Sequence, residues 1–427
     1  MTAFASTAVE TAPKRLTIGV VAAAVAGNAI EFYDFLAFSF FAVYIAGAFF
    51  PAGDDFANLL KTLAVFWSGF LFRPLGGVLI GAYADRVGRR QAMLLTIALI
   101  TVGTMGLAVI PSYASIGVAA PTLLVICRII QGFALGGEVG PASVFLVEAA
   151  PAGKRGFYMS WQIASQGLAV MSSGGLGVLL SLFLSKQELS DWGWRIPFMV
   201  CLALVPIALY LRRAMAETLA AHPTPSVKDD KGFFAHGWVI LLSVFLLLGG
   251  TVSTYVGNYM TTYAISTLKL PATLSLSATL IGGFSTFCFA LLGGWLGDRF
   301  GRKIIVLVPR IVMALAIWPL FLLLSNAPSA ATLWLATVAV NGITALSTGL
   351  SLVILPELLP KRIRATGFAV SYAVAVSIFG GSTQFVVTWL IGATHDPTSP
   401  AWYVVVTSLI TIAALLALPE TKDRAID

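Results

Sequence analysis

The sequence predicts an all-α polytopic membrane protein with twelve transmembrane helices, arranged as two similar six-helix bundles. Three observations carry this prediction: the composition, the spacing of the apolar segments and an internal repeat. Of the 427 residues, 58% are hydrophobic and only 11% are charged, and the mean hydropathy is +0.91. No soluble domain of this size needs so much apolar surface. Because a spanning helix needs about 20 apolar residues, the chain has room for about twelve.

Long apolar segments follow one another with short polar connections between them. In the first half we expect spans at residues 17–50, 56–84, 91–111, 120–149, 157–184 and 194–212. In the second half we expect spans at residues 236–268, 272–298, 303–325, 329–359, 364–394 and 400–419. The predicted organisation is a tail (1–16), a bundle (17–212), a linker (213–235), a second bundle (236–419) and a tail (420–427).

Positive charge is distributed unevenly over the connections. Nineteen of the 26 Lys and Arg residues lie at the two chain ends and on alternate connections. Cytoplasmic loops of membrane proteins carry such an excess, so both termini and the linker are expected in the cytoplasm. This distribution explains the net charge of +7 without a nucleic-acid partner. The first sixteen residues have no apolar core, so no cleaved signal peptide is expected.

Residues that hold metals or perform covalent chemistry do not cluster. Cys127, Cys201 and Cys288 lie in apolar segments and are interpreted as small buried hydrophobic side chains. The three histidines lie in or beside loops. We therefore expect no metal site and no cofactor, and neither an enzyme nor a primary pump.

The first span carries three polar side chains at membrane depth. Asn28, Glu31 and Asp34 recur every third residue, which places them within about 120° of one another on a helix. An ionisable group at bilayer depth costs about 2.5–3.5 kcal/mol on insertion scales. This stripe is therefore expected to line a polar cavity that the other helices enclose.

Two sequence patterns occur once in each half. Gly81–Arg90 (GAYADRVGRR) recurs as Gly294–Lys303 (GWLGDRFGRK), and Glu148 with Arg155 recurs as Glu357 with Arg364. Duplicated bundles are typical of transporters, because two similar units can rock about a site held between them.

These motifs resemble those of a known superfamily. The repeated Gly-x-x-x-Asp-Arg-x-Gly-Arg pattern resembles the signature of the major facilitator superfamily. Gly27–Phe35 and Arg128–Glu138 resemble the metabolite–proton symporter family within it. Three further stretches are most similar to its citrate and tricarballylate carriers: Gly156–Gln166, Trp192–Phe198 and Phe379–Trp402.

The resemblance implies the major facilitator fold and a secondary active transporter. It would import citrate or a related di- or tricarboxylate by proton symport through alternating access, as a monomer in the bacterial inner membrane. The partners would be the carboxylate substrate, protons and lipid. One alternative is the same fold carrying an osmolyte zwitterion, shikimate or a dicarboxylate. A drug–proton antiporter or a transporter-like sensor fits less well.

Arg128 is the first candidate for binding and coupling. It shares a stripe of the fourth span with Gln131 and Glu138, and a guanidinium at that depth needs a carboxylate partner. Asp34 or the substrate would supply it, and a permanent structural ion pair is the alternative. Asp34 is the preferred proton site, with Glu31 and Glu138 as further candidates because burial favours the protonated form of a carboxyl.

A wider set of polar residues is expected to contact the substrate. Hydroxyl and amide groups recur at helical spacing in the fifth, seventh and tenth spans, and half of them would be interhelical hydrogen bonds instead. Arg73 would supply a second cation, or pair with Glu138, whereas Arg310 is expected to snorkel to the cytoplasmic interface. The candidate substrate-binding residues are Asn28, Arg73, Arg128, Gln131, Tyr158, Gln162, Ser165, Gln166, Tyr255, Asn258, Tyr259 and Asn341.

The repeated charged loops are expected to form a cytoplasmic gate. Charge pairs and helix-end dipoles there would stabilise one conformation. Positive-inside topology alone would explain the basic residues but not the repeated acidic ones. The candidate gate residues are Asp85, Arg86, Arg90, Glu148, Arg155, Asp298, Arg299, Glu357 and Arg364.

Overall fold

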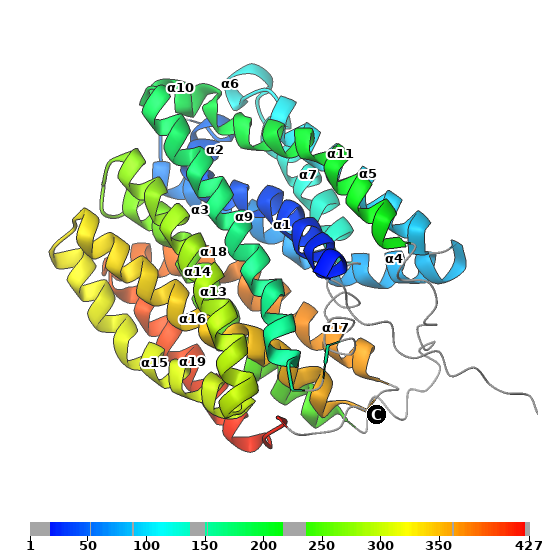
Figure 1. The fold of residues 1–427 in the computed structure, drawn as a ribbon. Coiled ribbons are helices and arrows are strands. Elements are labelled where there is room, and N and C mark those ends of the chain that lie inside the picture. Colours follow the sequence, from blue (N-terminus) through cyan, green and yellow to red (C-terminus); the bar gives the residue numbers. More distant parts are fainter. Residues whose placement is uncertain are drawn as a thin grey trace, which may run out of the picture.

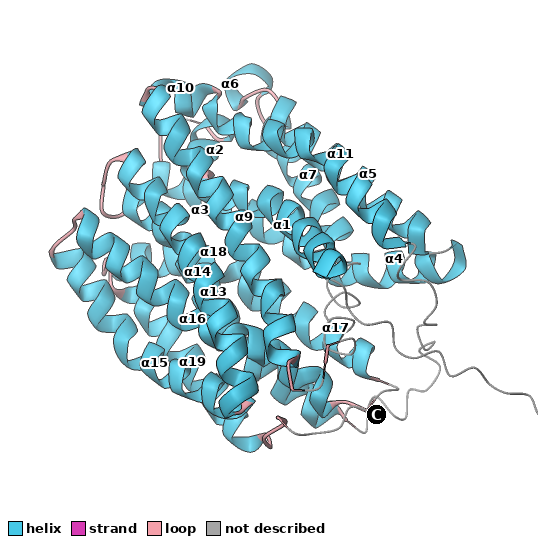
Figure 2. Cartoon of the chain, in the orientation of Figure 1, coloured by secondary structure: helices cyan, strands magenta, loops and turns pink. Residues whose placement is uncertain are grey.

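The structure is a computed structural model that describes residues 18–51, 53–87, 89–136, 150–151, 153–216, 236–360 and 363–422. Every regular element in these ranges is helical, as Figure 2 shows. The elements of the first half are α1 (Ile18–Phe40), α2 (Ala42–Phe49), α3 (Asp55–Leu71), α4 (Arg73–Val87), α5 (Arg89–Val109), α6 (Tyr113–Ile116), α7 (Ala119–Gly136), α9 (Arg155–Phe183), α10 (Lys186–Asp191), η1 (Gly193–Arg195) and α11 (Ile196–Ala216).

The second half continues the same pattern of long helices. Its elements are α13 (Gly237–Ser266), α14 (Ala272–Phe300), α15 (Arg302–Asn326), α16 (Ala330–Leu358), α17 (Arg364–Val374), the π-turn η2 (Ala375–Gly380), α18 (Gly381–Thr394) and α19 (Ser399–Ala417). In Figure 1 the blue and cyan helices of the first half lie mainly on one side, and the yellow, orange and red helices of the second half lie mainly on the other. The exact bundle boundaries stay a prediction, because residues 217–235 of the expected linker are outside the described ranges.

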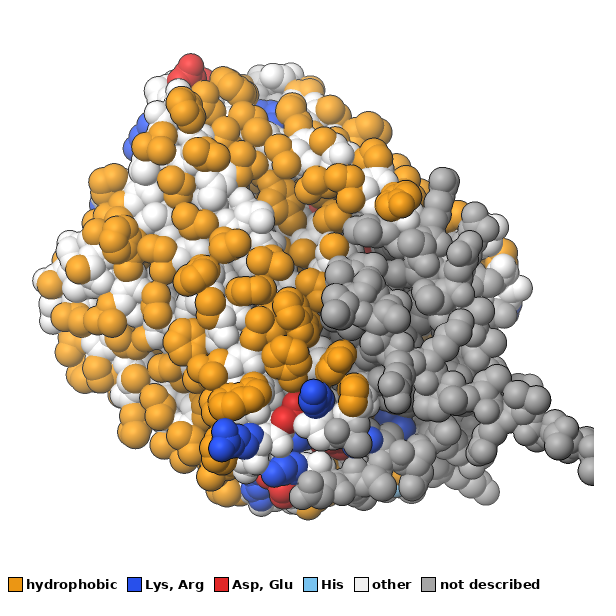
Figure 3. Space-filling model, in the orientation of Figure 1, with side chains coloured by type: hydrophobic (Ala, Val, Ile, Leu, Met, Phe, Trp, Pro, Cys, Tyr) orange, Lys and Arg blue, Asp and Glu red, His pale blue; other side chains and the backbone are white. Residues whose placement is uncertain are grey.

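The helices are long and apolar enough to cross a bilayer. Within the described ranges, nine helices pass a length and hydropathy test, and the bent pair formed by α1 and α2 adds a tenth span. Two shorter apolar helices, Leu94–Val109 and Gly193–Ile207, occupy the places expected for the third and sixth spans. Together they match the predicted order of twelve. Figure 3 shows hydrophobic side chains over most of the visible face and charged ones gathered at its lower end.

Several spans are interrupted along their length. The first span bends by 64° at Phe41, between α1 and α2, and in the second span α3 ends at Leu71 and α4 begins at Arg73. The α3 helix begins at a capping residue, because Asp54 Oδ1 accepts from the Ala57 N–H at 3.0 Å. In the eleventh span, the carbonyl of Ser377, within the π-helix η2, accepts from the Trp67 indole N–H at 3.1 Å. That bond joins the two halves.

The halves meet most closely along α9 and α14, which lie side by side in Figure 1. Glycine makes this approach possible. A Cβ on Gly167 would be 2.7 Å from the Phe287 backbone nitrogen, and one on Gly156 would be 2.8 Å from the Gly294 carbonyl oxygen. Small residues at helix contacts let backbones approach in membranes, where van der Waals packing rather than the hydrophobic effect holds helices together.

Candidate functional site

A buried carboxylate lies in the middle of α1. Asp34 is 2% exposed, and its Oδ2 accepts a hydrogen bond from Gln131 Nε2 of α7 at 2.5 Å. The same Gln131 nitrogen donates to Thr104 Oγ1 of α5 at 3.1 Å. Asp34 Oδ1 has no hydrogen-bond partner among the described residues. The carboxylate is thus held through one oxygen and leaves the other available for a proton.

Arg128 is tied to this carboxylate indirectly. Its Nη1 donates to Gln131 Oε1 at 2.9 Å, and its Nη2 donates to the Phe35 carbonyl at 3.5 Å. The two described side chains of Arg128 and Asp34 make no direct ion pair. The Gln131 amide lies between them, accepting from the guanidinium through its oxygen and donating to the carboxylate through its nitrogen. The expected coupling of Arg128 with Asp34 therefore runs through Gln131.

Aromatic rings enclose the Arg128 guanidinium. The carbon at its centre is 4.2 Å from the centroid of the Phe35 ring and 4.5 Å from that of Phe38. Arg73, at the start of α4, shares the Phe35 ring at 4.3 Å and also lies 4.2 Å from the centroid of Phe70. Ring faces attract cations, most strongly where water is excluded. Arg73 and Arg128 are the two candidate cations of the site that were predicted from the sequence, and both guanidinium groups contact the ring of Phe35.

Two buried cations lie against the same Phe35 ring. Arg73 and Arg128 are 6% and 0% exposed, and neither belongs to an ion pair within the described ranges. The Nε atoms of both guanidinium groups lack a partner there. Asp34 is joined to Arg128 only through Gln131, and an anionic ligand would stabilise two buried cations held so close together.

Amide groups join α1 to α9. Asn28 Nδ2 donates to Ser165 Oγ at 2.6 Å and to the Gln162 carbonyl at 3.3 Å, while Gln162 Nε2 donates to Asn28 Oδ1 at 3.0 Å. These bonds use most of the hydrogen-bonding capacity of the three side chains in this conformation. A substrate role for them stays a prediction and requires some of these bonds to exchange.

A cavity of about 40 Å³, lined by both apolar and polar residues, lies between the two halves. Leu36 of α1 and several α9 residues face the second-half helices across it. The polar residues that line it are Gln166, Thr254, Asn258, Thr286, Asn341, Thr344 and Thr348. Pockets for small molecules usually measure about 300–1,000 Å³. The cavity must therefore widen before it can hold a metabolite.

Two glycines make room for Asn341 at the edge of this cavity. A Cβ on Gly257 of α13 would be 2.5 Å from Asn341 Oδ1, and one on Gly282 of α14 would be 3.0 Å from Asn341 Nδ2. The Asn341 amide also donates to the Thr337 carbonyl at 2.9 Å. The close approach of α13 and α14 thus fixes an amide of α16 against the cavity.

The other candidate contact residues occupy varied positions. Tyr255 packs against Phe70, with ring centroids 5.4 Å apart, and so joins α13 to α3. The Tyr259 hydroxyl accepts from Thr388 Oγ1 at 2.8 Å. Tyr158 lies half-buried near the start of α9, and Glu31 is half-buried in α1. Glu138 is outside the described ranges. The roles assigned to all five stay predictions.

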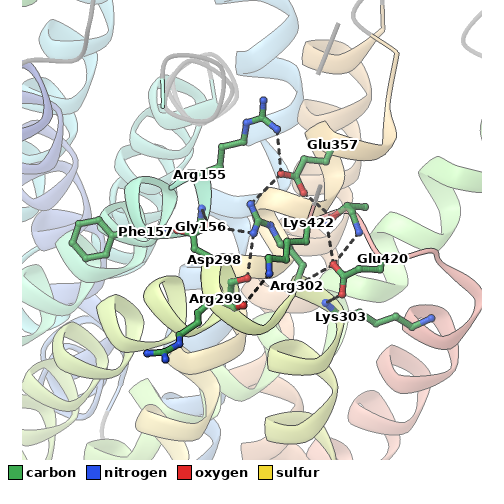
Figure 4. Close-up of polar contacts among 12 residues, drawn as sticks. Arg155, Gly156, Phe157, Asp298, Arg299, Arg302, Lys303, Glu357, Glu420 and Lys422 are labelled. Carbon is green, nitrogen blue, oxygen red and sulfur yellow. Dashed lines mark hydrogen bonds and ion pairs between the residues drawn. The ribbon is translucent and has the colours of Figure 1, made fainter. Parts of the chain in front are cut away.

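The candidate gate includes a carboxylate at a helix N-terminus, shown in Figure 4. Asp298 Oδ1 and Oδ2, on α14, accept from the backbone N–H groups of Gly156 and Phe157, each at 2.8 Å. These are among the first N–H groups of α9, which have no partner inside the helix and carry the positive end of its dipole. The second half thus caps a helix of the first half.

A second carboxylate joins the same cluster. Glu357 Oε1 lies 3.8 Å from Arg155 Nη1 and 3.4 Å from Arg302 Nη2, and Arg302 Nη1 lies 3.2 Å from Asp298 Oδ1. Thr421 Oγ1 donates to Glu357 Oε2 at 2.6 Å. Both carboxylate oxygens of Glu357 therefore have partners, and one of these partners, Arg155, belongs to the first half (Figure 4).

The segment after α19 is fastened to the start of α15. Glu420 Oε1 and Oε2 accept from the backbone N–H groups of Arg302 and Lys303 at 2.9 and 3.0 Å. Partial burial raises the pKa of the Glu420 carboxyl, but hydrogen bonds from the backbone N–H groups of Lys303, Thr421, Arg302 and Lys422 outweigh it. Its pKa therefore lies below the ordinary value.

The remaining candidate gate residues are less informative. Arg86 and Arg299 are exposed, and Arg299 lies 5.6 Å from the centroid of the Trp295 ring. Arg364 Nε donates to the Pro356 carbonyl at 2.9 Å. Glu148 is outside the described ranges, and so are the side chains of Asp85 and Arg90.

Three contributors were missed at the sequence level. Arg302 lies inside the repeated motif but was not singled out, and its pairing with Asp298 four residues earlier is an i, i+4 helix pair that the spacing could have indicated. Glu420 and Thr421 follow the last span directly. No pattern in the sequence marked them, because their partners are more than sixty residues away.

Regular elements that are all helical in the described ranges, about twelve spans, a cavity between the halves and a cluster of charged contacts at one end are typical of a multi-pass membrane transporter. The chain belongs to the Major Facilitator Superfamily, whose family model matches residues 35–382. The predicted superfamily and fold are thereby confirmed.

Individual relatives narrow the comparison. The citrate-proton symporter of Salmonella typhi is 37% identical over 94% of each chain. The proline/betaine transporter of Salmonella typhimurium is 34% identical over 95% of this chain and 84% of its own. Among solved structures, that of a D-xylose-proton symporter matches with a TM-score of 0.74 at 21% identity, covering 96% of this chain and 99% of its own. The resemblance to citrate–proton symporters is thus confirmed.

Proposed function

We propose that this protein imports citrate or a closely related di- or tricarboxylate together with protons, by alternating access. One observation carries the substrate class: two buried guanidinium groups, Arg73 and Arg128, share the Phe35 ring, and neither belongs to an ion pair with a described side chain. A polycarboxylate supplies the missing negative charge. The similarity to the citrate-proton symporter supports the same assignment.

Proton coupling is assigned to Asp34. Its ionised form accepts from Gln131, which in turn accepts from Arg128. A proton on Oδ1 removes the negative charge of Asp34. The hydrogen bonds that link Asp34 to Arg128 through Gln131 then become weaker. The guanidinium is then more available to an anion, so proton and substrate favour each other. Both ligands drive the transition only through their different affinities for the two conformations.

The test is uptake of labelled citrate by proteoliposomes under an imposed inward proton gradient. We expect accumulation that collapses when a protonophore is added, and competition by tricarballylate and dicarboxylates. Failure of every carboxylate, with accumulation of proline or betaine instead, would replace this proposal by the zwitterion alternative, which the similarity to the proline/betaine transporter favours.

The gate is the second part of the proposal. Asp298 and Glu357 hold the start of α9 against the second half, and the inward-open state requires these contacts to separate. We assign them to a lock that stabilises the state closed to the cytoplasm.

Replacing Asp298 by Asn should shift the protein toward the state that is open to the cytoplasm. The variant loses a charged acceptor for two N–H groups, a loss on the order of 2 kcal/mol, which corresponds to a shift of roughly thirtyfold between the two states. Spin labels at Lys154 and Phe300, both exposed, would report a longer distance population. Asp191→Asn, at the far end of the molecule, is the matched control. An unchanged distance distribution in Asp298→Asn would exclude the lock.

A further inference from the structure

Arg310 is buried in the second half, and the expectation that it snorkels to the interface is wrong. Its side chain is 1% exposed. It is the eighth residue after Arg302, the first residue of α15, so it lies about 12 Å along the helix from the start. Snorkelling needs a face that opens to the headgroups. The Arg310 side chain instead points between α13 and α16.

Neutral oxygen atoms receive all the described hydrogen bonds of this guanidinium. Nη1 donates to the Gly249 carbonyl at 2.8 Å and to Ser253 Oγ at 3.1 Å. Nε and Nη2 both donate to Ser347 Oγ, at 3.1 and 2.6 Å, and Nη2 reaches the Thr344 carbonyl at 3.4 Å. No ion pair in the described ranges includes Arg310. The charge is oriented by these oxygens but not neutralised.

This charge lies directly behind the wall of the cavity between the halves. Thr344 and Thr348 line that cavity. A Cβ on Gly250 would be 3.4 Å from both Arg310 Nη2 and Thr348 Oγ1. The guanidinium is therefore one side-chain layer from the lining hydroxyl, and the missing side chain at Gly250 leaves the space between them open.

A buried cation without an anion is costly, and its field is screened little in a low-dielectric interior. Arg73 and Arg128 are buried cations of the first half, and Arg310 is a buried cation of the second. A ligand with a single carboxylate can satisfy one half only. A ligand with two or three carboxylates can be attracted by both halves at once.

We propose that Arg310 is a specificity-determining positioning residue, which holds a second carboxylate of the substrate against Thr344 and Thr348 and so selects di- and tricarboxylates over monocarboxylates and zwitterions. This inference rests on the proposed function. It adds that the second half contributes its own cation, which draws the halves together around a polycarboxylate.

The test compares charge-removing and charge-retaining variants. Arg310→Gln should raise the KM for citrate and the inhibition constant of tricarballylate at least tenfold, with the maximal exchange rate within threefold of the wild type. The inhibition constant of butyrate, with one carboxylate, should stay within threefold. Arg310→Lys should recover most of the citrate affinity, because it restores the charge. A purely structural role would instead change all three ligands together.

Two further variants separate charge from folding. Ser347→Asp places a carboxylate beside the guanidinium and neutralises it without removing it, so it should reproduce the loss of citrate affinity even where Arg310→Gln does not fold. Thr261→Ala removes a buried hydrogen bond of α13 to the Ser275 carbonyl, away from the cavity lining. It should lower thermal stability without changing the ratio of citrate to butyrate affinity.

The outcomes distinguish the two proposals. A wild-type protein that accumulates citrate, with unchanged citrate affinity in both Arg310→Gln and Ser347→Asp, overturns the role of Arg310 and leaves the transport proposal standing. A wild-type protein that accumulates no carboxylate under a proton gradient overturns both.

Discussion

Replacing Arg128 by Gln should lower the affinity for citrate roughly a hundredfold. The guanidinium is fully buried among phenylalanine rings and is the cation nearest to the proposed proton site. Removing one member of a buried charge pair costs about 3 kcal/mol, the equivalent of two orders of magnitude in affinity. Binding of labelled citrate to purified protein gives the affinity directly, without dependence on proton coupling.

Two variants make this result specific. Arg128→Lys keeps the charge but loses the flat contact with the rings and the geometry of the bond to Gln131, so its affinity should fall between those of the wild type and Arg128→Gln. Arg195→Gln removes an arginine of the same half, one that donates to the Asp191 and Ile110 carbonyls, and should bind citrate as the wild type does. Wild-type affinity in Arg128→Gln would make the guanidinium purely structural.

The fold was largely predictable from hydropathy, and its irregularities were not. A run of apolar residues fixes the length of a span, so the boundaries of α13 and α16 lie within a few residues of the expected ones. The 64° bend at Phe41 carries no proline or other local signal. Hydropathy therefore gives the length of this span but not the place where it bends.

The sequence predicted which residues belong to the candidate site. It did not predict the hydrogen bonds that join them. Helical spacing placed Asp34 on one face of α1 and Arg128 with Gln131 on one face of α7. It could not give the rotation of one helix against another, which decides that the Gln131 amide lies between the two charges. Arg310 shows the same limit, because its distance from the helix start indicates depth but not the direction in which the side chain points.

The contacts of the gate depend on conformation as well as on sequence. The repeated motif indicated that Asp298 has a role, but its partners, the N–H groups of Gly156 and Phe157, belong to the other half. Such contacts exist only while the two halves are closed at that end. A transporter sequence must be compatible with at least two conformations. The sequence pattern therefore does not tell which contacts form in which conformation.

Replacing Asp34 by Asn should separate transport from coupling. The Asn side chain keeps an oxygen that can accept from Gln131 Nε2, so the bridge to Arg128 is preserved while the site can no longer bind and release a proton. We expect citrate exchange between the two sides to continue within a few fold of the wild-type rate, and to lose its dependence on pH. Accumulation driven by an inward proton gradient should disappear.

Exchange and accumulation are measured in the same proteoliposomes, with and without an imposed gradient. Asp54→Asn is the matched control, because it also removes a carboxylate yet keeps an oxygen that can cap α3 at the Ala57 N–H. It should retain both exchange and accumulation. Gradient-driven accumulation by Asp34→Asn would assign the proton to another carboxyl, whereas loss of exchange as well would give Asp34 a role in holding the bundle rather than in coupling. The asymmetry between its bonded Oδ2 and its unpartnered Oδ1 is the reason to expect the first of these patterns, exchange without accumulation.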